Sequence, residues 1–174
     1  MKRADQYRTP PGVVIIPATA HHGNVIAALH AQNFDEAWSP FTVRQVMNMP
    51  GAFGLIAVTE ATADADPADS ADLADLVGFA LARTVGGECE LLSLAVSVAK
   101  RECGFGQALL DGVLQRAAEA SAASAFLEVA EDNTVAQHLY RGRGFAAVGR
   151  RPGYYRRGSG PAMAALTYSL SLAS

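Results

Sequence analysis

The sequence has few of the residues that would indicate a disulfide scaffold, a metal site or a membrane span. Its 174 residues include only two cysteines, so we expect free thiols rather than a disulfide framework. The four histidines show no metal-ligand spacing with the cysteines and no helical HExxH arrangement, so we expect no bound metal. No apolar run reaches the length of about 20 residues that a bilayer span requires. Residues 1–12 also lack the apolar segment of a signal peptide, and we therefore expect a cytoplasmic protein with no membrane partner.

Charge is also sparse and nearly balanced. Charged residues make up 18% of the chain and the formal net charge is −3, so the total predicts neither a nucleic-acid nor a membrane partner. Residues 60–75 contain acids and no base, whereas arginines gather in the C-terminal third, either to attract an acidic partner or RNA or simply to keep the surface soluble. They are Arg141, Arg143, Arg150, Arg151, Arg156 and Arg157. We expect no direct nucleic-acid binding.

Half of the residues are hydrophobic, which is enough to bury the core of one domain. Residues 1–11 are polar and broken by prolines, and we interpret them as a flexible tail before a single domain over 12–174. Residues 60–75 are rich in Ala and Asp and have few large apolar side chains. Such a segment buries too little surface to offset its ordering entropy, so we expect a mobile hairpin tip within the domain.

The apolar periodicity predicts an α/β domain. An antiparallel meander precedes a strand–helix–strand crossover, which makes its two flanking strands parallel, so we expect a mixed sheet with helices on both faces. The expected strands span 13–16, 53–59, 76–84, 88–98, 124–129, 145–149 and 162–170, and the expected helices span 20–33, 104–122 and 134–141, with another that begins at 39–40.

The chain is organised around LLSLAVSVAKRECGFGQALL, residues 91–110, where a buried strand passes through two glycines into a helix. Gly104 and Gly106 have no side chains, so a ligand can approach the backbone closely. The first turn of the helix leaves several N–H groups without partners, and such groups bind phosphate well. Alone, this RxxGxG pattern is a weak signal, because glycines at such a junction often only form the turn.

Later motifs add context. The series V-x(4)-RxxGxGxxLL, LEV and N-x(5)-LYxxxGF, within a region from about 13 to 170, resembles the GNAT acyltransferases. Within them, LEVAEDNTVAQHLYRGRGF followed by RRPGYY is similar to the bacterial ribosomal-protein-alanine N-acetyltransferases, the RimI-like group. The resemblance implies the GNAT fold, a mixed and mostly antiparallel sheet whose central parallel strands splay apart after Val96.

The resemblance also implies a function: transfer of acetyl from acetyl-CoA to the α-amino group of a protein N-terminus, with a ribosomal protein as acceptor. Two alternatives stay open, a GNAT enzyme that acetylates a small-molecule amine and a non-catalytic CoA-binding module. The second is encouraged by Glu102, which replaces a position that is usually basic in the family, and by the atypical Cys103.

In the family, the pantetheine of acetyl-CoA lies along the strand and the pyrophosphate meets the amides of the glycine corner. By match, Asn133 contacts the cofactor, caps the next helix, or does both. Arg101 either offsets Glu102 or is a solvated surface charge. The cofactor-binding residues that the resemblance implies are Leu94, Ala95, Val96, Arg101, Glu102, Cys103, Gly104, Phe105, Gly106, Gln107 and Asn133.

Acetyl transfer to an amine needs a base for the amine and an acid for the departing thiolate. In RimI-like enzymes these are the acid of LEV and the tyrosine of LY, which correspond to Glu128 and Tyr140. Without the family pattern, Glu128 could lie on a solvated face and Tyr140 could simply pack on the sheet. Glu88 and Glu90, on the strand where other GNAT enzymes keep their base, are the alternative bases.

Three aromatic residues are candidates for the acceptor site. Trp38 lies in the aromatic linker NFDEAWSPF, which is either pinned to the core or lines a substrate groove, and in the family this loop is one wall of the peptide groove. Tyr154 and Tyr155 follow RRPG, and we expect them in a loop between the last two strands. The family has a tyrosine pair facing the peptide here, although packing at a strand edge is the alternative.

Overall fold

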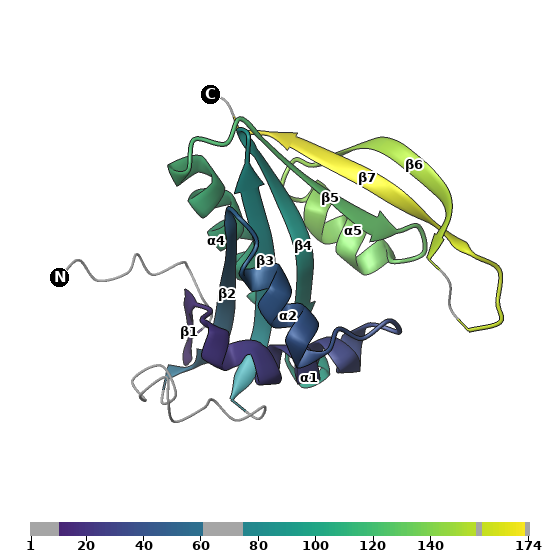
Figure 1. Cartoon of the computed structure of the whole chain (residues 1–174). Helices are drawn as coiled ribbons and strands as arrows, with labels where there is room; N and C mark the ends of the chain where they lie inside the picture. The colour runs from purple at the N-terminus through teal and green to yellow at the C-terminus, as the bar shows by residue number, and fades with distance from the viewer. Residues whose placement is uncertain (1–10, 61–74, 156–157, 173–174) are drawn as a thin grey trace.

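Seven strands form one mixed sheet in the order β1-β2-β3-β4-β5-β7-β6 (Figure 1). The computed structural model describes residues 11–60, 75–155 and 158–172. Almost all of the expected N-terminal tail and acidic insert lies outside the described residues. Among the helices of the described chain, none has the length and apolar character needed to cross a membrane.

The first four strands form the predicted antiparallel meander. They are β1 (Val13–Pro17), β2 (Ala52–Thr59), β3 (Leu76–Val85) and β4 (Glu88–Val96). Gly86 and Gly87 turn the chain between β3 and β4 with φ of 62° and 82°, a left-handed conformation that glycine adopts without steric cost.

Helices cover both faces of this meander, as predicted. A 3₁₀ turn (Ala20–His22) leads into α1 (Gly23–Asn33), and α2 (Pro40–Met47) begins at Ser39, whose hydroxyl accepts a hydrogen bond from the Thr42 amide at 3.1 Å. We call the face covered by α1 and α2 the α1 face (Figure 1). Its core includes Ile26, Leu29, Val43, Ile56, Val58, Phe79 and Leu81.

The opposite face, the α4 face, is covered by α4 (Phe105–Glu119) and α5 (Thr134–Arg141). Successive residues of a strand point to opposite faces, so Leu55 and Ala57 of β2 pack on this side while Ile56 packs on the other. The α4-face core also contains Leu109, Leu110, Val113, Leu127, Tyr140 and Tyr168.

The parallel pair separates earlier than predicted. β5 (Ser124–Ala130) pairs with β4 only from Glu88↔Ser124 to Leu91↔Leu127, so the expectation that the strands splay after Val96 is wrong by five residues. The cause is a bulge, because β3 pairs Ala82 with Leu91 and Leu81 with Ser93, which leaves Leu92 as an extra residue that bends β4. β4 also ends at Val96 rather than at 98, and Val98–Lys100 form a 3₁₀ turn.

The last two strands are β6 (Ala146–Tyr155) and β7 (Met163–Ser171). The prediction that β6 ends at 149 and that Tyr154 and Tyr155 lie in a loop is wrong, because both tyrosines belong to β6. β6 is an edge strand, and an edge strand tolerates a proline such as Pro152 because one of its sides forms no ladder hydrogen bonds. Gly153, with φ of 65°, lies in a register shift that keeps the strand going.

His30 is a buried histidine that the sequence does not single out. It is 3% exposed, and its ring stacks on Phe34 at 4.3 Å and on Trp38 at 4.7 Å between centroids. Its Nδ1 accepts a hydrogen bond from the Trp38 amide at 3.2 Å. Burial lowers the pKa of His30 from 6.5 to about 4, so the native protein holds a neutral imidazole in the wall formed by α1 and the 34–39 loop.

We expect this imidazole to make stability depend on pH. Below pH 6.5 the His30 side chain is protonated in the unfolded chain, but in the native protein it stays neutral until about pH 4. The free energy of unfolding therefore decreases as the pH falls below 6.5. The buried His22, whose pKa is also lowered, contributes in the same direction. Thermal unfolding from pH 7.5 to 4 checks this. His30→Asn, which keeps an acceptor for the Trp38 amide, should flatten the pH dependence of Tm, whereas His138→Asn at an exposed position should not.

Candidate active site

The glycine corner between β4 and α4 presents a row of free backbone donors. Gly104 has φ of 85° and caps α4, and the first helical hydrogen bond joins the Ala108 amide to the Gly104 carbonyl at 3.0 Å. Within the described chain, the amides from 102 to 107 donate no backbone hydrogen bond. Such amides, together with the positive end of the helix dipole, favour an anion. The corner therefore has the donor set that a phosphate group needs.

Arg101 is an exposed residue of the corner whose side chain contacts the end of α1. Its Nη2 donates a hydrogen bond to Oδ1 of Asn33, at the end of α1, at 2.7 Å. Arg101 is thus an exposed surface charge, as one of its two interpretations expected, and it is held by a hydrogen bond to α1. Glu102 is exposed and has φ of 62°, a conformation that is uncommon for a residue with a side chain. Cys103 is a free, exposed cysteine.

Among the strands of the described residues, none pairs with one side of β4 beyond the bulge. β5 pairs with β4 only as far as Leu91, so the edge of β4 that carries Leu94, Ala95 and Val96 is open toward the gap between the two strands (Figure 1). An unpaired strand edge offers N–H and C=O groups to a ligand that lies along it. Leu94 and Val96 pack on the α4-face core, and Ala95 packs on the α1-face core.

Asn133 acts as the helix cap that the sequence predicted. Its Oδ1 accepts a hydrogen bond from the Ala136 amide at 3.1 Å, at the start of α5. The other interpretation, a cofactor contact, remains a prediction.

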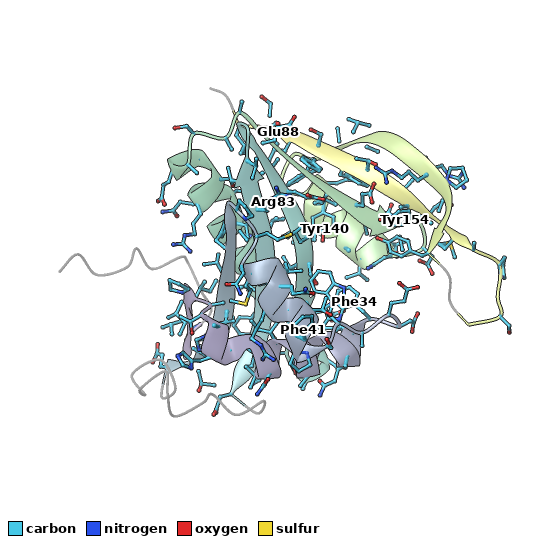
Figure 2. The ribbon with its side chains drawn as sticks, viewed as in Figure 1. Phe34, Phe41, Arg83, Glu88, Tyr140 and Tyr154 are labelled. Carbon is cyan, nitrogen blue, oxygen red and sulfur yellow. The ribbon has the colours of Figure 1, made fainter. Side chains whose placement is uncertain are left out.

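Tyr140 lies on α5 in the angle between β4 and β5 (Figure 2). It is 7% exposed, and its ring packs near Phe145 and Tyr168, with centroids 6.0 and 6.5 Å away. Burial, together with Tyr155, raises the pKa of Tyr140 to about 12. The phenol therefore keeps its proton at neutral pH and has one to donate.

Glu128 is the first β5 residue after the last rung of pairing with β4. Its neighbours Leu127 and Val129 pack in the α4-face core, so its carboxylate points to the α1 face. It is half-buried, with a side chain 22% exposed, and its Oε1 lies 3.0 Å from Nε of Arg151. The guanidinium of Arg151 also lies over the Tyr154 ring, 5.6 Å from the centroid. The structure thus links the candidate base to the strand that carries the tyrosine pair.

Tyr155 connects the groups that the sequence proposed separately. Burial raises its pKa first, followed by the charges of Tyr154, Glu128 and Glu36, and Tyr155 in turn raises the pKa of Tyr140. Tyr155 thus interacts electrostatically with the candidate acid Tyr140, with the candidate base Glu128 and with Glu36 in the 34–39 loop. Tyr154 packs edge-on against Tyr155, with 5.0 Å between centroids, and is half exposed.

Trp38 is held in place by its stacking on His30, so the interpretation that this loop is pinned to the core is confirmed. Pinning does not remove the loop from the site, because it also carries Glu36. Phe34 and Phe41, at the two ends of the loop, remain exposed (Figure 2).

The alternative bases occupy the paired end of the parallel strands. Glu88 pairs with Ser124 and is exposed, far from Tyr154 in Figure 2. Glu90 pairs with Phe126, two residues before Glu128 on the same strand face. Glu90 is therefore the nearer of the two to the gap and remains a competitor of Glu128.

Sequence reasoning did not name Glu36, Arg151 or Ser93 as site residues. Glu36 is an acidic residue in an aromatic loop and Arg151 is one of several arginines, so neither belongs to a recognisable sequence motif. Their relevance depends on partners far away in the chain. Within the described residues, no group of three or more His, Cys, Asp and Glu side chains could hold a metal ion.

Known proteins are similar to this chain in sequence or in fold. The [ribosomal protein bS18]-alanine N-acetyltransferase of Haemophilus influenzae is 36% identical over 85 residues, 49% of this chain and 58% of that protein. The match thus spans little more than half of the relative.

Two solved structures share the fold across nearly the whole chain. The ribosomal-protein-S18-alanine N-acetyltransferase of Escherichia coli has a TM-score of 0.80 at 20% identity, and the alignment covers 93% of this chain and 95% of that one. NAA60 of Arabidopsis thaliana, crystallised in complex with acetyl-CoA, has a TM-score of 0.76 at 18% identity, with 91% and 98% covered.

The model of the acetyltransferase (GNAT) family matches residues 34–145. This segment runs from the 34–39 loop through the bulged β4, the glycine corner and Glu128 to Tyr140 and Phe145. The chain belongs to the acetyltransferase (GNAT) family.

Proposed function

We propose that this protein transfers an acetyl group from acetyl-CoA to the α-amino group of a protein N-terminus, with a ribosomal protein as acceptor. One observation carries the proposal: Glu128 is the first β5 residue past the last rung between β4 and β5, and Tyr155 interacts electrostatically with both Glu128 and Tyr140. The 85-residue similarity to a ribosomal-protein-alanine N-acetyltransferase supports the choice of acceptor. A ribosomal acceptor would place the activity in the cytoplasm.

The residues at hand fit acetyl-CoA, which supplies an activated acetyl thioester. The amides from 102 to 107 would hold its pyrophosphate, and the open edge of β4 at Leu94, Ala95 and Val96 would hold its pantetheine. Asn133 would contact the cofactor from the start of α5, and the mouth of the acceptor site would be formed by Trp38, Tyr154 and Tyr155.

In the proposed mechanism, Glu128 takes a proton from the acceptor ammonium, because only a neutral amine has the lone pair that attacks the thioester carbonyl. Tyr140 then gives its phenolic proton to the departing thiolate, and the second proton that the nitrogen loses as the amide forms restores the phenol. The carboxylate and the phenol approach from opposite faces of the sheet, which lets each serve a different reactant.

The proposed function includes no direct binding of nucleic acid, and ion pairs of the C-terminal arginines support this. Arg143 pairs with Asp111, Arg150 with Glu131, and Arg151 with Glu128. Three of the arginines of the C-terminal third are thus neutralised by carboxylates of the same chain.

The test is a panel of acceptors assayed for CoA release. N-terminal peptides, including that of ribosomal protein bS18, are compared with polyamines and aminoglycosides. Turnover with peptides is expected. Turnover with small amines alone would refute the proposed acceptor, and tight acetyl-CoA binding without any turnover would identify a non-catalytic CoA-binding module.

Glu102 provides a prediction about the cofactor. Its exposed carboxylate lies in the row of amides that would meet the pyrophosphate, so Glu102→Arg should tighten acetyl-CoA binding severalfold, and more at low salt, where charges are screened less. Glu102→Gln, which only removes the charge, should give a smaller gain. Calorimetry at two salt concentrations measures both. Equal affinities for all three proteins at both salt concentrations would contradict the placement of the pyrophosphate.

A further inference from the structure

The hydroxyl of Ser93 is a buried polar group without a partner. Ser93 is 8% exposed, and its Oγ makes no hydrogen bond within the described residues. Most buried polar side-chain atoms in folded proteins have a partner, and an unsatisfied one needs an explanation. Leaving such a group unpaired costs stability, so a ligand is a reasonable candidate for the missing partner.

Ser93 lies at the fork of the parallel strands. The last rung of the pair is Leu91↔Leu127, and Ser93 follows the bulge residue Leu92 directly. On the other side of the fork, Glu128 is the first residue past the same rung. The two side chains therefore begin at the same level of the gap, one on each strand.

They also point to the same face. Ser93 pairs with Leu81, and Ala95 lies two residues further along β4, and both of these pack in the α1-face core. Glu128 points to the α1 face as well, because Leu127 and Val129 pack on the other side. This is the face over which α1 and the 34–39 loop lie (Figure 1), on the acceptor side of the proposed site.

We infer that the Ser93 hydroxyl binds the amino group of the acceptor, opposite Glu128 across the fork. This inference rests on the proposed function. The acceptor ammonium donates one N–H to Oγ of Ser93 while Glu128 removes another proton. The N–H held by Ser93 stays on the nitrogen, and the lone pair freed by Glu128 is left for the thioester carbonyl. Ser93 is uncharged, so it orients the nitrogen without competing for its proton.

The test separates ligand binding from a structural role through two readouts. Ser93→Ala should weaken peptide binding to the protein·CoA complex about tenfold, the value of one hydrogen bond of about 1.4 kcal/mol, with acetyl-CoA affinity unchanged. Tm should stay the same or rise, because the variant no longer buries an unpaired hydroxyl. Ser93→Thr, which keeps the hydroxyl, should retain the affinity.

Thr84→Val is the matched control, because Oγ1 of Thr84 is also a buried hydroxyl but lies beside the Cys89 thiol, at the paired end of β4. It should leave peptide affinity unchanged. Wild-type peptide affinity in Ser93→Ala, or a fall in its Tm without loss of affinity, would overturn the inference. Failure of the wild-type protein to bind or acetylate any peptide would instead overturn the proposed function, and it is seen before any variant is compared.

Discussion

Glu128→Gln and Tyr140→Phe should each lower kcat about 10²- to 10⁴-fold, the usual contribution of a general base or acid. Acetyl-CoA affinity should hardly change, because neither side chain belongs to the glycine corner or to the open edge of β4. Gln keeps the size of Glu128 without its charge, and Phe keeps the ring that packs on Phe145 and Tyr168. Steady-state kinetics with an N-terminal peptide, and calorimetry with acetyl-CoA, measure the two effects.

The two variants should differ in their dependence on pH. Loss of the base should be partly rescued at high pH, where more of the acceptor amine is already neutral. Loss of the acid should not be rescued, because the thiolate still lacks its donor. Burial raises the pKa of Tyr140 to about 12, so in the wild-type protein the phenol stays protonated over the whole range in which the amine titrates.

Glu88→Gln and Glu90→Gln are the matched controls on β4. Both remove a carboxylate from the α1 face of the neighbouring strand, at the paired end of the fork. Near-normal activity of Glu128→Gln at all pH values, together with loss of activity in Glu90→Gln or Glu88→Gln, would assign the base to β4 and contradict the mechanism.

Arg151 extends this argument from the base to its surroundings. Its ion pair with Glu128 crosses β7, because Arg151 pairs with Ala165 and Glu128 pairs with Thr167. The same guanidinium covers Tyr154. One side chain thus contacts both the carboxylate of Glu128 on β5 and the ring of Tyr154 on the edge strand β6. This contact helps to explain how residues of two strands that are not neighbours can form one site.

Local rules account for the parts of the fold that the sequence predicted well. The bounds of α5 follow from a cap, Asn133, and from a strongly amphipathic segment that ends before Gly142, all within ten residues. The meander follows from alternating apolar runs and from the Gly86-Gly87 turn. The glycine corner was found because its glycines lie at a fixed spacing.

The errors arose where a distant partner decides the structure. Pro152 and Gly153 have the local signature of a turn, but they lie in an edge strand that β7 holds, and edge position cannot be read from a local pattern. The bulge at Leu92 lies in an uninterrupted apolar run, so nothing marked the early separation of β4 from β5. The relevance of Ser93 depends on the same bulge and could be seen only once the register was known.

Gly104→Asp should abolish acetyl-CoA binding, because it brings a carboxylate to the amides that would hold the pyrophosphate. It also forces a side chain into the left-handed conformation that Gly104 adopts, with φ of 85°. Asn has nearly the same shape as Asp and tolerates this conformation better than most residues. Gly104→Asn therefore controls for the backbone, and the difference between the two variants reports the charge.

Gly106→Asp should have the same effect without the backbone strain, since a Cβ at this position would meet Leu139 and Val96 at 3.6 Å, an ordinary contact. Gly106→Ala should therefore fold and bind acetyl-CoA much as the wild-type protein does, while Gly106→Asp should fold and fail to bind. Because the repulsion is electrostatic, any residual binding of the Asp variants should improve with salt, the opposite of the trend expected for Glu102→Arg. Wild-type affinity in both folded Asp variants, measured by calorimetry, would mean that the phosphates bind elsewhere and that the free amides of the corner serve only to begin α4.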